Sequence, residues 1–136
     1  MNDSHDDELL EQFEACALPL ESFRHRVHIQ IAFLYLCKYP LLDVLARFPE
    51  ALKRYAAAHG KTGLYHETIT WSYILLIHER MQRAGRAQSW AEFASANPDL
   101  LTWADSILKQ YYRGETLSSD LARNIFLFPD KAPARS

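Results

Sequence analysis

Apolar side chains recur at the spacing of an α-helix over about residues 65–84, between Gly63 and Gly85. The apolar positions of this stretch are Ile69, Trp71, Tyr73, Ile74, Leu75, Leu76, Ile77 and Met81. Gly85 follows directly, and glycine is favoured where a helix ends because it adopts the left-handed conformation without steric cost. The sequence therefore predicts that the longest helix of the chain runs from about residue 65 to residue 84.

A second stretch, residues 23–38, is apolar on more than one face and stops before Pro40, which predicts a central helix covered by others. Shorter helices are expected over about residues 4–17, 41–56, 89–96, 98–112 and 118–126. Pro49 would either kink its helix or start a new one. No stretch alternates as a strand would. We therefore predict an all-α fold, a compact bundle of about five to seven helices with two long central helices (about 23–38 and 65–84).

Composition limits the class of protein. At 136 residues and 49% hydrophobic content, residues 1–130 are expected to form a single helical domain, with residues 131–136 as a frayed tail. The formal charge of −2 argues against nucleic acid, and no apolar run approaches the roughly 20 residues that cross a membrane. The acidic residues near the start do not resemble a targeting segment, so we expect a cytoplasmic protein. Cys16 and Cys37 form no C-x-x-C motif and predict free thiols.

Two histidines and a carboxylate fall on one face of the helix predicted over residues 23–38. At about 100° per residue, Glu21, His25 and His28 lie within one narrow stripe, although Pro19 could place Glu21 before the helix begins. Imidazole nitrogens and carboxylate oxygens are ligands for divalent transition metals. This face predicts part of a metal site, without distinguishing iron, copper, zinc or nickel.

A further ligand must come from another helix, and His66 at the start of the longest helix is the first candidate. Glu67 is about 100° away from it and would need favourable docking to reach the same ion. Two histidines and one carboxylate form the ligand set of many non-haem iron enzymes. The sequence hypothesis is thus a small metal-binding protein that acts on a small molecule, either as an oxygenase or as a hydrolase.

Other side chains could line a substrate pocket beside this site. The candidates are Tyr35, Thr70, Tyr73 and Arg123, with Tyr39, Tyr65 and Trp71 as further aromatic residues that are more often core. Arg123 could hold a substrate carboxylate or could fasten the C-terminal part of the chain by pairing with Asp120 or Asp130, and we favour the fastening role.

A non-catalytic function stays open. With six histidines in the chain, some pair three or four residues apart is expected by chance in about half of such sequences. The histidines would then be structural or lie at the surface, as we expect of His5 and His59. The protein would in that case be an interaction or accessory module, and assembly with a partner protein or with further copies is possible.

Three stretches resemble those of a family of short bacterial helical proteins. They have the forms F-x-H-x-x-H (residues 23–28), Y-H-E-T-I-T (residues 65–70) and S-x-x-A-R-x-x-F-x-x-P-D (residues 119–130). The resemblance spans about residues 19–130, places His25, His28 and His66 inside the recurring stretches, and implies no particular activity. The histidines are also similar in outline to those of the metal-binding four-helix DinB-like proteins, from which the spacing and the chain length depart.

Overall fold

Every regular element is helical in the computed structural model, which describes residues 3–131. Within that range there is no strand, so the predicted all-α class is confirmed. The α-helices are α1 (Asp3–Glu14), α2 (His25–Lys38), α3 (Leu41–Ala58), α4 (Glu67–Ala84), α5 (Trp90–Ala96), α6 (Gly114–Leu117) and α7 (Asp120–Asn124). Four 3-10 turns join them: η1 (Leu20–Ser22), η2 (Thr62–Leu64), η3 (Pro98–Leu100) and η4 (Ile107–Gln110).

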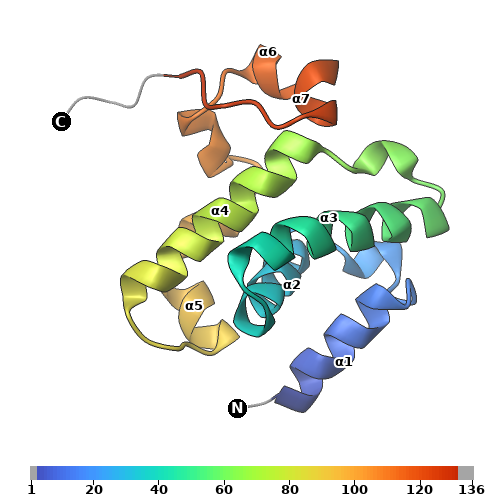
Figure 1. Ribbon diagram of the computed structural model, residues 1–136, viewed down its shortest axis with the longest axis vertical. Coiled ribbons are helices and arrows are strands. Elements are labelled where there is room, and N and C mark those ends of the chain that lie inside the picture. Colours follow the sequence, from blue (N-terminus) through green and yellow to red (C-terminus); the bar gives the residue numbers. More distant parts are fainter. Residues whose placement is uncertain (1–2, 132–136) are drawn as a thin grey trace.

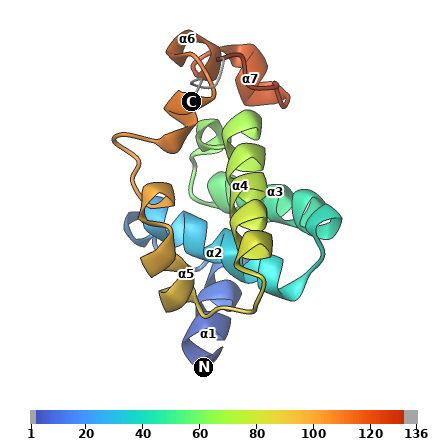
Figure 2. The same cartoon turned by 90° about the vertical axis from the view of Figure 1, so that its left-hand side faces the viewer.

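Helix α4 crosses the middle of the molecule and contacts α2, α3 and α7 (Figure 1). Helix α1 packs on the other side of α2 and α3. Helices α6 and α7 lie together at one end, and the N-terminus lies at the opposite end (Figure 2). The two helices predicted as central, α2 and α4, are in contact with each other, and α3 is as long as α4.

An aromatic cluster fills the space between α1, α2 and α3. The Phe13 ring lies 5.5 Å from that of Phe23, 5.8 Å from that of Phe48 and 5.4 Å from that of Tyr55. Phe13, Phe48 and Tyr55 are almost completely buried, and the Tyr55 hydroxyl donates a hydrogen bond of 2.8 Å to the Leu18 carbonyl. Each of these rings removes a large apolar area from water, so the cluster is a main source of stability for this half of the bundle.

Several predicted helix boundaries need correction. Helix α1 ends at Glu14 rather than near Ala17, and Cys16 has a left-handed φ of 61° after the helix end. Helix α3 runs through Pro49 without a break, so this proline does not start a new helix. The last short helix, α7, ends at Asn124 and not at Phe126.

The largest error concerns residues 98–112, for which a single helix was expected. The structure has η3, then an irregular segment, then η4. Two contacts with other helices hold the chain away from a helical path. The Leu100 carbonyl accepts a hydrogen bond of 2.9 Å from His25, and the Ser106 hydroxyl pairs at 2.7 Å with that of Tyr73. Because Ser106 also accepts from the Leu108 N–H, it begins a new turn there.

Smaller predictions about single residues and segments can also be compared with the structure. His59 was expected at the surface, but its ring is partly buried and its Nε2 lies 3.2 Å from the Cys16 carbonyl oxygen. Cys16 and Cys37 are free, as expected. The predicted frayed tail, apart from Lys131, lies outside the described residues. Between residues 3 and 131, no helix is both long and apolar enough to cross a membrane.

Candidate functional site

One cavity of about 370 Å³ is lined by all three histidines that the sequence pattern indicated. His25 and His28 come from the first turns of α2, and His66 immediately precedes α4. The remaining wall comes from the segment before α2 and from α3, η2, α4, α7 and the loop between η3 and η4. The other lining residues are Phe23, Arg24, Leu52, Gly63, Leu64, Ile69, Thr70, Tyr73, Trp103 and Arg123.

His25 is fixed by a hydrogen bond from one of its ring nitrogens. Its Nε2 lies 2.9 Å from the Leu100 carbonyl oxygen, and because a carbonyl can only accept, Nε2 carries the proton. Nδ1 therefore keeps a free lone pair in the neutral ring. The ring also packs 5.0 Å from that of Tyr73 and 5.3 Å from that of Trp103. Burial lowers the pKa of His25, and the bond to Leu100 opposes this only in part.

His28 is held by packing alone. Its ring stacks on Phe23 at 5.3 Å with an interplanar angle of 25°, and lies 5.6 Å from the ring of Phe48. Neither ring nitrogen makes a hydrogen bond to any side chain or backbone group of residues 3–131. Burial, with a smaller contribution from His25, lowers the pKa of His28 to about 4. The ring is thus neutral at pH 7 and offers the cavity an unprotonated nitrogen.

His66 has both ring nitrogens occupied. Nδ1 accepts a hydrogen bond of 3.1 Å from the Ile69 N–H, which makes His66 the N-cap of α4, and Nε2 donates one of 2.7 Å to the Leu117 carbonyl. The side chain is only 7% exposed, and burial is the main cause that lowers the pKa of His66. To bind a metal, this ring would have to give up at least one bond that now satisfies a backbone group.

The two predicted carboxylate ligands, Glu21 and Glu67, do not line the cavity. Glu21 lies in η1 and is exposed, and Glu67 accepts a hydrogen bond from the Tyr65 hydroxyl. Over residues 3–131, no three or more His, Cys, Asp or Glu side chains are grouped so that they could hold a metal ion. Of the proposed ligands His25, His28, His66, Glu21 and Glu67, only the three histidines line the same cavity, and they are not grouped so that they could hold an ion together. Metal binding stays a prediction.

Of the predicted pocket residues, Thr70, Tyr73 and Arg123 line the cavity and Tyr35 does not. Tyr35 lies further along α2, where its hydroxyl donates a hydrogen bond of 2.6 Å to Glu14. Burial and this bond raise the pKa of Tyr35. Its role in the structure is to connect α2 to α1.

Arg123 fastens α7 to the segment that leads into α4, and not to Asp120 or Asp130. Its Nη1 donates hydrogen bonds of 2.6 Å to the Gly63 carbonyl and 3.2 Å to the Tyr65 carbonyl. Asp130 is instead bound by the Arg113 N–H at 3.0 Å. The guanidinium group is thereby positioned at the edge of the cavity.

Trp103 is the site residue that sequence reasoning missed. It falls within residues 98–112, where a helix was expected, but it lies in the irregular segment after η3 with 51% of its surface exposed, beside His25. A neighbouring cavity of about 400 Å³ shares Trp103, Arg123, His66 and Ile69 with the histidine cavity. Nothing in the local sequence separates Trp103 from a core tryptophan.

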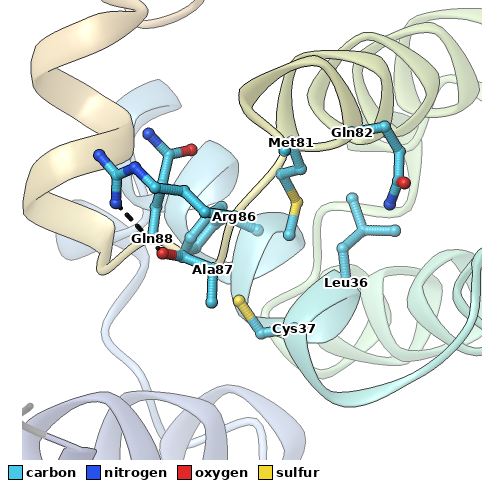
Figure 3. A pocket seen from close by; sticks show the side chains of 9 residues that line it. Leu36, Cys37, Met81, Gln82, Arg86, Ala87 and Gln88 are labelled. Atoms are coloured by element: carbon cyan, nitrogen blue, oxygen red, sulfur yellow. Dashed lines mark hydrogen bonds between the residues drawn. The ribbon is translucent and has the colours of Figure 1, made fainter.

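A third cavity, of about 450 Å³, lies at the opposite ends of α2 and α4 (Figure 3). It is lined by Cys37, Met81 and residues 85–88, among others, and Arg86 at its edge donates a hydrogen bond of 3.3 Å to the Ala87 carbonyl. Its wall contains no imidazole or carboxylate group. The histidine cavity, with its unprotonated imidazole nitrogens, is therefore the better candidate for a functional site.

Comparison of this chain with protein-family models, with curated proteins and with solved structures gives no significant match. The functional argument therefore depends on the chemistry of the cavity itself. The family suggested by the three sequence stretches stays a prediction.

Proposed function

We propose that this protein binds a small organic molecule in the histidine cavity, with His25 and His28 accepting hydrogen bonds from N–H or O–H groups of that molecule. The observation that carries the proposal is the position of His28, whose ring is neutral and has no hydrogen-bond partner among the described residues. No fully buried side-chain nitrogen or oxygen of residues 3–131 lacks a hydrogen-bond partner, so the unpaired ring nitrogens of His28 reach solvent, where a ligand that donates a hydrogen bond can replace water.

The cavity has the size and composition of a binding site for a small molecule. Its volume of about 370 Å³ lies within the range of ligand pockets, and its wall combines apolar side chains with a few polar groups. His25 adds a second acceptor, because its protonated nitrogen is already used on Leu100. Thr70 supplies a hydroxyl that can donate or accept.

Binding of a small molecule is better supported than acid–base catalysis by His28 in the protein alone. A general base works best when its pKa lies near the working pH, whereas the pKa of His28 is lowered to about 4. A ligand with negative charge near His28 would raise that pKa and make the ring a stronger base. Catalysis by His28 would therefore depend on the charge of the bound molecule.

Protein-observed NMR with a library of small fragments tests the proposal. We expect fragments with N–H or O–H groups to shift the ring signals of His25 and His28 and to leave those of the distant His5 unchanged. The His28→Leu variant should lose binding while the fold, followed by backbone amide shifts, is retained. A library that leaves both rings of wild-type protein unshifted at millimolar concentration would refute small-molecule binding in this cavity.

Metal binding is the second candidate, and one observation favours it. A metal-bound imidazole usually donates its other N–H to a carbonyl or carboxylate, as His25 does to Leu100. His25 and His28 would supply two nitrogen ligands, and a substrate or water would supply the remaining ones. An oxygenase or a hydrolase requires such open positions on its metal ion. Mass spectrometry of untagged protein should then find a stoichiometric ion that is lost in His28→Ala and kept in His66→Asn. Metal-free protein that also fails to take up added Zn²⁺ or Fe²⁺ would exclude this candidate.

A further inference from the structure

The wall of the histidine cavity has a one-sided charge. Arg24 and Arg123 both line it, and no aspartate or glutamate does, although the chain as a whole carries a formal charge of −2. The adjoining cavity is lined by Lys109 and again by no acidic side chain, although Asp105 lies 3.9 Å from the Lys109 ammonium and offsets its charge. The cationic groups at these cavities therefore attract anions and disfavour cations.

Arg123 keeps donors available for a ligand. Both of its bonds to Gly63 and Tyr65 use Nη1, so the N–H groups of Nη2 and Nε have no partner among residues 3–131. The two backbone bonds hold the guanidinium in place, which reduces the entropy lost when it binds a ligand. A guanidinium edge of this kind matches the two oxygens of a carboxylate.

Trp103 offers an apolar surface beside that charge. Half of its side chain is exposed, and it lines both cavities together with Arg123. The Trp103 ring lies beside His25 and lines both cavities with Ile69. A large aromatic side chain in such a position can pack against a flat apolar group of a ligand. The polar acceptors, the cationic group and the aromatic surface thus lie along one continuous wall.

From this arrangement we infer that the ligand of the histidine cavity is a small carboxylic acid with a flat apolar portion, its carboxylate held by Arg123 and its apolar portion lying against Trp103. This inference depends on the proposed function, and it names the chemical class of the ligand. An N–H or O–H group on the same molecule would reach His25 or His28 in the deeper part of the cavity. The ligand charge would also raise the basicity of those imidazoles.

Matched aromatic probes test the inference. We would titrate wild-type protein with benzoate, benzamide, benzylamine and phenyl phosphate, and follow the ring signals of His25 and His28 together with the indole N–H of Trp103, which is assigned with the Trp103→Phe variant. Benzoate should bind about tenfold more tightly than benzamide, since a charge-assisted hydrogen bond is roughly twice as strong as a neutral one. Benzylamine should not bind.

Two arginine variants locate the charge. Arg123→Gln should abolish the preference for benzoate over benzamide, and Arg123→Lys should keep part of it through the remaining charge. Arg83→Gln, at the far end of α4, changes the net charge equally and should leave the preference intact. Thermal unfolding of each variant identifies any variant that is not folded. If a variant fails to fold, the comparison of the four probes on wild-type protein still tests the inference.

Each outcome has a separate meaning. Equal or tighter binding of benzamide or benzylamine at these signals would overturn the carboxylate inference and leave small-molecule binding intact. Tighter binding of phenyl phosphate than of benzoate would overturn the choice of a carboxylate. Probes that shift none of these signals, together with a fragment library that shifts none, would refute both proposals.

Discussion

Protonation of His28 should destabilise the protein as the pH falls from 7 to 5. The folded state holds the pKa of this ring at about 4, compared with 6.5 for an ordinary histidine. Because the unfolded chain takes up the proton more readily, the folded state loses stability once the pH falls below about 6.5. The loss is complete below about pH 4.

The size of the effect follows from the two pKa values. At pH 7 both states are mostly unprotonated and the difference is a few tenths of a kcal/mol. At pH 5 the unfolded ring is almost fully protonated and the folded ring only about one tenth, which lowers the free energy of unfolding by about 2 kcal/mol relative to pH 7. Below pH 4 the total approaches about 3 kcal/mol.

The pH window from 7 to 5 separates this effect from those of the carboxyl groups. Asp99 and Asp130 have lowered pKa values because Arg80 and Thr116 respectively hydrogen-bond to them, and stability from such groups is lost only below their ordinary pKa near 4. His25 and His66 act in the same direction as His28, since burial lowers the pKa of each. A variant at His28 alone is needed to isolate its share.

Urea unfolding at pH 7 and pH 5, for wild type and His28→Gln, measures that share. We expect the wild type to lose about 2 kcal/mol more than the variant between the two pH values. The NMR titration of the His28 ring in wild-type protein should show no midpoint above pH 5. Equal losses in the two proteins, or a midpoint near 6.5, would refute the assignment of a partly buried, unprotonated ring to this position.

Substitutions at three further positions test the contacts that support the site and the fold. His66→Ala removes the cap of α4 and the donor to Leu117 and should cost about 1–3 kcal/mol in urea unfolding, whereas His66→Asn keeps a cap and should cost less. Tyr55→Phe leaves the Leu18 carbonyl without its donor and should cost roughly 1–3 kcal/mol, and no loss would show that water replaces the hydroxyl. Phe13→Ala should cost about 3–5 kcal/mol by thermal unfolding, since it empties the centre of the aromatic cluster, and a loss below 1 kcal/mol would contradict that packing.

The parts of the fold that the sequence predicts well are those where local pattern and tertiary packing agree. Helix α4 was expected over about residues 65–84 and is observed from Glu67 to Ala84, with Gly85 in the left-handed conformation at a φ of 71°. Helix α5 was expected over about residues 89–96, and Ser89 and Glu92 form a capping box at its start. At these positions the backbone is satisfied by groups within a few residues, which a sequence pattern can represent.

The segment after Pro98 could not be predicted in this way, because distant groups determine its path. Its apolar residues fit a helical period, but His25 binds the Leu100 carbonyl and Tyr73 binds Ser106. These partners are far from the segment in the sequence and invisible to periodicity. The same error concealed Trp103, which a regular helix would have turned toward the core.

The three histidines of the cavity differ mainly in how many ring nitrogens the protein already uses. His66 uses two, His25 uses one and His28 uses none within the described chain. A sequence pattern treats them alike, since spacing reports direction around a helix and not the occupancy of a ring nitrogen.

That difference also explains how the cavity is formed. His25 binds the backbone at Leu100 and His66 binds it at Leu117, so both rings hold C-terminal segments of the chain against α2 and α4. These segments contribute Trp103 and Arg123 to the wall. The two histidines that the fold uses for structure thus help to enclose the cavity that His28 lines without a hydrogen-bond partner. Because their hydrogen bonds differ, the three rings are not equivalent as metal ligands.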